Sequence, residues 1–140
     1  MSHDAPINTG RLKHLEMIQQ VINRLAGNAF IIKGWSITLT SALLLFIAKE
    51  DKDQIAWAAV LVILAFWLLD ALYLQKERQF RALYNHYIQQ PQNSATDFKM
   101  DISQFKDQVG SVWKVLFAPS LISLHLPLLI GLVLVLVLIR

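Results

Sequence analysis

The chain has 140 residues, of which 55% are hydrophobic and only 16% are charged, and its formal charge is +3. Soluble domains carry about a quarter charged residues, so this composition favours a protein that lies in lipid. The positive charge is too small and too scattered for a nucleic-acid-binding protein, and the absence of cysteine excludes disulfides and thiolate metal sites. We therefore expect no nucleic-acid partner.

Three apolar stretches are long enough to cross a bilayer, because roughly 20 helical residues span a hydrocarbon core of about 30 Å. They cover residues 30–48, 55–74 and 116–139. The helices of a soluble bundle would show a polar stripe toward water, and residues 55–69 and 126–139 have none. The sequence therefore predicts an all-α membrane protein with a single membrane domain over residues 1–140.

The first predicted helix covers residues 11–48 and includes the first span. Its N-terminal half carries an apolar stripe at spacings of three and four residues, made by Leu12, Leu15, Ile18, Ile22, Leu25 and Ala29. Polar residues fall away from this stripe. We therefore expect an amphipathic helix outside the membrane that continues directly into the span.

The second predicted helix covers residues 53–90, between the expected N-cap Asp53 and the helix-ending Pro91. Beyond the membrane it again has one apolar face, made by Phe80, Leu83, Tyr84, Tyr87 and Ile88. The connection at residues 49–54 is tight. The first two helices should therefore form a long antiparallel hairpin with extensions outside the membrane.

Residues 91–102 are predicted to form a loop, because they begin with Pro91 and other turn-forming residues. Residues 103–139 are predicted to form an amphipathic helix followed by the third span. The apolar face of the amphipathic part is made by Phe105, Val109, Val112, Trp113, Leu116 and Phe117. Pro119 should kink or restart this helix, and His125 should bond a neighbouring helix inside the span.

The orientation follows from the lysines and arginines that flank the spans, because positive residues are retained in the cytoplasm. The N-terminal side has four, the first connection two, the second connection six and the tail one. This pattern predicts a multi-pass protein with a cytoplasmic N-terminus and an external C-terminus.

The hairpin register predicts an ion pair between Lys33 and Asp70. With the turn centred near residues 51 and 52, residues whose numbers sum to about 103 lie at equal height, and these two satisfy that sum. Two alternatives stay open. Both charges could snorkel separately to the membrane interface, or they could line a pore.

Catalytic motifs are scarce in this sequence. It has no Gly-rich phosphate loop and no histidine pair at metal-ligand spacing, so we expect no enzyme activity, no cofactor and no metal site. Arg81 and His86 have the Arg-x4-His spacing of HEPN ribonucleases, in which two protomers form the RNA-cutting site. The alternative is helix packing, which Tyr84 and Tyr87 favour.

The extensions outside the membrane carry more apolar surface than one hairpin can easily bury, and such a surface usually marks an interface. The candidate interface residues are Leu15, Ile18, Ile22, Leu25, Phe80, Tyr84 and Tyr87. Small residues in the first span also permit close helix approach and interhelical hydrogen bonds, namely Ser36, Thr38, Thr40, Ser41 and Ala42. The sequence therefore predicts a homo-oligomer.

Two segments, Gly-Trp-Ser-Ile-Thr-Leu-Thr at residues 34–40 and Phe-Trp-Leu-Leu-Asp-Ala-Leu-Tyr-Leu-Gln-Lys-Glu-Arg-Gln-Phe-Arg-Ala-Leu-Tyr at residues 66–84, carry a family resemblance. They resemble small bacterial membrane proteins of the SLATT type, two-span effectors encoded with antiphage modules. The similarity covers residues 12–90 best, and the third span departs from the two-span pattern. No catalytic residues transfer.

This resemblance implies an oligomeric effector or accessory protein of a bacterial defence system. Such a protein would perturb or permeabilise the inner (cytoplasmic) membrane when a cytoplasmic protein partner signals. The alternative is a structural or regulatory membrane subunit that anchors a cytoplasmic complex without forming a pore.

Overall fold

The computed structural model describes residues 9–50, 53–91 and 97–139. Every regular element in these ranges is helical. The elements are α1 (Thr9–Glu50), α2 (Asp53–Gln89), the short 3-10 helix η1 (Ser103–Phe105), α3 (Lys106–Val109), α4 (Val112–Leu116) and α5 (Pro119–Ile139). Three of the helices, α1, α2 and α5, are long and apolar enough to cross a membrane, which confirms the predicted all-α membrane fold.

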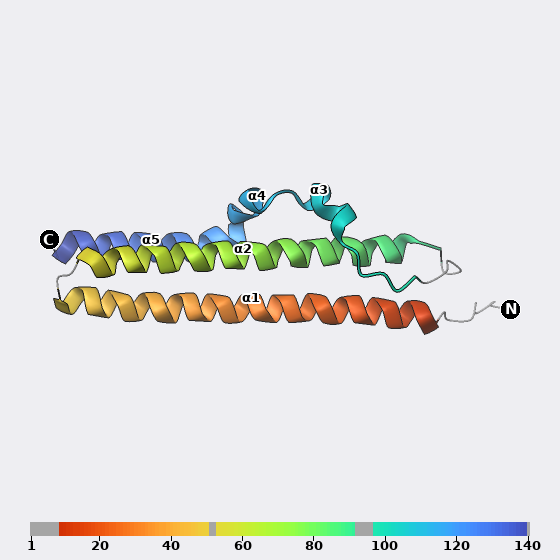
Figure 1. The fold of residues 1–140 in the computed structure, drawn as a ribbon, viewed down its shortest axis with the longest axis horizontal. Helices are drawn as coiled ribbons and strands as arrows, with labels where there is room; N and C mark the ends of the chain where they lie inside the picture. The colour runs from red at the N-terminus through yellow and green to blue at the C-terminus, as the bar shows by residue number, and fades with distance from the viewer. Residues whose placement is uncertain (1–8, 51–52, 92–96, 140) are drawn as a thin grey trace.

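The helices α1 and α2 lie side by side and antiparallel, and α5 lies along the N-terminal half of α2 (Figure 1). The C-terminal end of α5 therefore lies beside the end of α1 and the beginning of α2. Because α5 consists almost entirely of apolar residues, the part of the hairpin beside it is the part that lies in the membrane. The remaining halves of α1 and α2 continue beyond this three-helix bundle.

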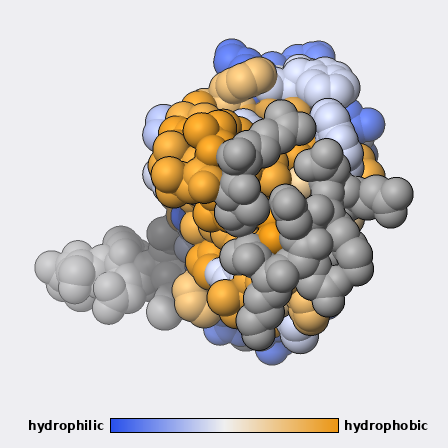
Figure 2. Space-filling view, turned by 90° about the vertical axis from the view of Figure 1, so that its left-hand side faces the viewer, coloured by the Kyte–Doolittle hydropathy of each residue, from blue (hydrophilic) through white to orange (hydrophobic). Residues whose placement is uncertain are grey.

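The surface of the three-helix bundle is suited to lipid. Viewed from the end that α5 shares with the hairpin, the described residues form a largely hydrophobic surface (Figure 2). Large apolar side chains are exposed on each helix, including Phe46 on α1, Trp57 on α2 and Leu138 on α5. In water these side chains would be costly to expose, whereas lipid tails solvate them.

The segment after α2 differs from the prediction of one amphipathic helix from residue 103 up to the restart at Pro119. It is interrupted at Gly110, whose φ of 85° and ψ of 177° lie outside the helical region and favour glycine. A second interruption follows α4, and α5 begins on Pro119, since proline is favoured in the first turn of a helix. The predicted restart at Pro119 is therefore confirmed, whereas the break at Gly110 was not predicted.

Three apolar clusters follow one another along the length of the molecule. The membrane end is filled by Ile47, Ala56, Ala59, Ile63 and Leu132. The middle, where α4 and α5 meet α2, is filled by Ala71, Val115, Ala118 and Leu121. The opposite half is filled by Ile18, Ile22, Leu83 and Phe105. Between the first two clusters lies a group of buried polar side chains.

Candidate functional site

Lys33 on α1 and Asp70 on α2 meet in the interior, with Lys33 Nζ 2.6 Å from Asp70 Oδ1. The Asp70 side chain is fully buried, whereas 29% of the Lys33 side chain is exposed. The second carboxylate oxygen, Oδ2, has no hydrogen-bond partner within the described chain. The structure thus brings together the two charges that the hairpin register places at one height.

Two hydroxyl side chains continue the polar face of α1 from Lys33 into the membrane part. Ser36 lies three residues after Lys33, and Thr40 lies four residues after Ser36, so all three lie on the same side of the helix. Both are fully buried, and neither hydroxyl has a partner among the residues that the structure describes. Thr38, by contrast, is exposed and donates to the Gly34 carbonyl at 2.9 Å.

The helix α5 contributes His125, which is also fully buried. Its ring stacks on Trp67 of α2, with centroids 5.6 Å apart and planes 9° from parallel. Its Nδ1 lies 3.1 Å from the Leu121 carbonyl, and its Nε2 has no partner in the described chain. The contact of His125 with the neighbouring helix is therefore ring stacking, and its hydrogen bond stays within α5.

Trp67 also fixes the path of the chain between α4 and α5. Its indole Nε1 donates a hydrogen bond to the Leu116 carbonyl at 3.0 Å. Leu116 is the last residue of α4, so this bond attaches the α4–α5 junction to α2 and places His125 beside the hairpin.

We call Lys33, Ser36, Thr40, Asp70 and His125 the polar cluster. At a rise of about 1.5 Å per residue, its polar groups reach about 10 Å along α1, from Lys33 to Thr40. Beyond Thr40 the bundle interior is apolar, beginning with Ile63. The polar cluster therefore extends part of the way into the membrane and ends there.

The polar cluster is costly to the fold in its present form. A buried polar atom without a hydrogen bond costs about 1–3 kcal/mol, and four atoms of the polar cluster have no partner in the described chain. Ionisable side chains inside membrane spans are commonly part of ion or substrate pathways. Chemically, the polar cluster offers a carboxylate oxygen, two hydroxyls and an imidazole nitrogen to a water molecule, an ion or a group from another chain.

The predicted interface residues lie mostly at contacts within the chain itself. Ile18 and Ile22 are buried within the chain itself, in one apolar cluster with Leu83 and Phe105, and their contact with a second copy stays a prediction. The remaining predicted interface residues, Leu15, Leu25, Phe80, Tyr84 and Tyr87, are half-buried. Besides α2, the segment after α2 contributes Met100, Ile102 and Phe105 to this cluster, and sequence periodicity did not place that segment here.

Arg81 and His86, the two residues of the nuclease motif, have different partners. Arg81 pairs with Glu77 at 2.7 Å, whereas the His86 ring lies 3.0 Å from Gln90 and near the ring of Phe105. Five residues along a helix turn a side chain by about 140°, so the two do not share a face of α2. The structure does not bring them together.

The end of the hairpin away from the three-helix bundle is held by polar contacts to backbone carbonyls. Arg11 donates to the carbonyls of Tyr87 and Ile88 at 2.8 and 2.9 Å, which satisfies the C-terminal end of α2. His14 is buried, contacts the Tyr87 ring, and its Nε2 lies 3.2 Å from the Lys99 carbonyl. These bonds attach the start of α1 to α2 and to the segment beyond it.

No protein-family model, curated protein or solved structure matches this chain. Within residues 9–50, 53–91 and 97–139, no group of three or more His, Asp or Glu side chains is placed to hold a metal ion. Among the described residues, the polar cluster is therefore the candidate functional site. Its functional groups are an ion pair, two hydroxyls and an imidazole.

Proposed function

We propose that this chain is an oligomeric protein of the bacterial inner membrane that perturbs or permeabilises the bilayer when a cytoplasmic partner acts on it. The observation that supports this proposal is the polar cluster, which places the ionisable residues Lys33, Asp70 and His125 inside a bundle that faces lipid. The resemblance to SLATT-type proteins extends the proposal to an effector or accessory role in bacterial defence.

A change of arrangement is part of this proposal, because the interior beyond Thr40 is closed by apolar side chains such as Ile63 and Leu132. Among the described residues, one copy in this conformation has no polar route across the membrane part. Permeation therefore requires the three helices to shift, or the polar faces of several copies to combine. The unpartnered atoms of the polar cluster favour either change, since both would supply missing hydrogen bonds.

The long hairpin supplies a means of coupling to a partner. Both α1 and α2 run without interruption from the end held by Arg11 to the level of Lys33 and Asp70. A helix is stiff over such a length. A partner that displaces one helix against the other at the end held by Arg11 would therefore strain the ion pair. A displacement of one helical turn is about 5.4 Å, which is enough to separate the two charges.

The proposal is tested by measuring leakage from liposomes that contain the purified full-length chain, with a potential-sensitive dye. We expect the chain to dissipate an imposed potential in a manner that depends on protein density. Thr40→Val should change this rate, because it removes a hydroxyl of the polar cluster. Thr38→Val is the matched control, since Thr38 is exposed and lies on another face of the same helix.

Liposomes that hold their potential at every protein density, together with cells that keep theirs when the chain is expressed with its genomic neighbours, would contradict the proposal. The alternative function, a structural or regulatory subunit that anchors a cytoplasmic complex, would then be favoured. The observation behind this alternative is that the ion pair and the apolar cluster around Ile63 close the bundle in its present conformation.

A further inference from the structure

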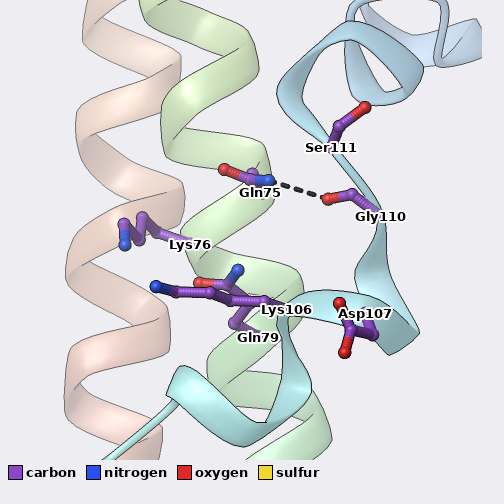
Figure 3. A pocket seen from close by; sticks show the side chains of 7 residues that line it. All are labelled: Gln75, Lys76, Gln79, Lys106, Asp107, Gly110 and Ser111. Carbon is purple, nitrogen blue, oxygen red and sulfur yellow. Dashed lines mark hydrogen bonds between the residues drawn. The ribbon is translucent and has the colours of Figure 1, made fainter.

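A polar pocket lies between α2 and the junction of α3 with α4, outside the three-helix bundle. It is a cavity of about 400 Å³, lined by Gln75, Lys76 and Gln79 from α2 and by residues of the α3–α4 segment that include Lys106 and Ser111. Its wall is held by a hydrogen bond of 2.8 Å from Gln75 Nε2 to the Gly110 carbonyl (Figure 3).

This polar pocket has a positive charge and an unused hydrogen-bond acceptor. Its charged lining residues are Lys76, Lys106 and Asp107, with two positive charges against one negative. Figure 3 shows the two lysine side chains extending to the same side of α2, with Asp107 on the other side. Gln79 is 1% exposed, and its Oε1 accepts no hydrogen bond in the described chain.

An apolar groove of about 300 Å³ lies next to the polar pocket along α4, lined by Leu64, Trp67, Leu68, Trp113, Leu116 and Phe117. Trp113 and Phe117 are largely exposed, at 73% and 69%. Both cavities use the same face of α2, because Leu64, Leu68, Gln75 and Gln79 follow one another at helical spacings of four, seven and four. From Leu68 to Gln75 is about 10 Å along the helix axis.

The order of these two cavities matches the order of groups in a phospholipid. The apolar groove lies beside Trp67, at the level of the membrane bundle, whereas the polar pocket lies beyond Asp70 on the side away from it. Trp113 and Lys114, on α4 between them, are residue types that favour the headgroup region. A lipid in this position would place its charged headgroup in the polar pocket and an acyl chain in the apolar groove.

We propose that these two cavities form a binding site for an anionic phospholipid with a hydroxyl-bearing headgroup, of the phosphatidylglycerol class. Lys76 and Lys106 bind the phosphate, as basic pockets beside transmembrane helices do for anionic headgroups. A headgroup hydroxyl supplies a donor for Gln79. Trp113 and Phe117 cover the acyl chain. This site does not depend on the permeabilising function, since an anchoring subunit would use it equally.

The test measures lipid retention by the full-length chain in detergent, by native mass spectrometry after addition of phosphatidylglycerol or phosphatidylcholine. We expect phosphatidylglycerol to be retained preferentially. A Lys76→Ala, Lys106→Ala double variant should weaken phosphatidylglycerol binding by about 25-fold, since a lysine near anionic lipid contributes about 5-fold. It should leave phosphatidylcholine binding unchanged. Lys99→Ala is the control, because Lys99 is exposed and pairs with Asp97 away from both cavities.

Phe117→Ser provides a second variant that tests the apolar groove, and it should reduce retention of both lipids. Equal retention of the two lipids by the unaltered chain would overturn the proposal. Inorganic phosphate retained as well as phosphatidylglycerol would also overturn the proposal, since the site would then bind a free anion. These results are independent of any measured leakage.

Discussion

Lys33 and Asp70 form an ion pair of 2.6 Å across the hairpin although 37 residues separate them in the chain. The same register that joins them brings Ile47 of α1 and Ala56 of α2 into one buried cluster near the turn. The two helices therefore keep a constant alignment from the turn to the edge of the membrane part. Counted from the turn, the apolar interior gives way to polar side chains at Thr40, and the ion pair lies about 10 Å further along the hairpin.

Breaking this ion pair should destabilise the hairpin. We expect Lys33→Ala and Asp70→Ala each to reduce the free energy of unfolding by about 3 kcal/mol, because the remaining charge would be left unpaired in surroundings of low dielectric. The exchange Lys33→Asp with Asp70→Lys should recover part of the loss. Thermal unfolding in detergent measures all three variants. An exchange no better than the single changes would show that the pair does not hold the helices together.

The orientation prediction is tested by reporters at both ends of the chain. We expect a reporter that is active only in the cytoplasm to function when fused before Met1 and to be silent when fused after Arg140, since the positive residues flank the cytoplasmic side. Activity at the C-terminal fusion would mean that α5 does not cross the membrane or that the whole chain is inverted.

Gly110 should be the glycine that is least tolerant of substitution. Gly110→Ala is expected to destabilise the chain by about 1–3 kcal/mol, because φ is 85° and a Cβ would lie 3.1 Å from Lys114 Cδ. Gly27→Ala is the matched control, since nothing lies within 4 Å of its Cβ position and alanine favours a helix by about 1 kcal/mol. The two unfolding temperatures should move in opposite directions; a loss at Gly27 equal to that at Gly110 would contradict this explanation.

Self-association, if it uses the halves of the hairpin outside the bundle, should depend on exposed apolar residues and not on the buried isoleucines. Leu12→Ser should reduce the oligomer mass measured by light scattering in mild detergent, because Leu12 is 48% exposed. Ile18→Ala should instead lower stability by about 2–5 kcal/mol through the cavity it leaves. A monomeric unaltered chain at micromolar concentration would contradict the predicted homo-oligomer.

The fold followed closely from the sequence where one local pattern decided the outcome. The helices predicted over residues 11–48 and 53–90 correspond to α1 (Thr9–Glu50) and α2 (Asp53–Gln89). A tight connection sets the register of two antiparallel helices. The pairing of Lys33 with Asp70 could therefore be predicted by counting residues from the turn. Pro119 was a usable signal because its ring restricts where a helix can begin.

Of the polar cluster, only the pairing of Lys33 with Asp70 was predicted from the sequence. The sequence predicts that Ser36 and Thr40 permit close helix approach and interhelical hydrogen bonds, whereas their spacing from Lys33 also puts them on its face of α1. That spacing was the available signal for their burial beside the charge. No comparable signal linked His125 to Trp67, since the stacking depends on where α5 returns along α2.

By itself, the sequence determined the membrane class, the three spans and the hairpin register, because hydrophobic length, helical periodicity and a tight turn act over short stretches of chain. Tertiary structure alone decided the path of residues 97–118. That path breaks at Gly110, covers Ile18 and Ile22 with Phe105, and attaches to α2 through Trp67 and Leu116. Such contacts join residues far apart in the chain, so their free energy depends on the shape of the whole bundle and not on any local pattern.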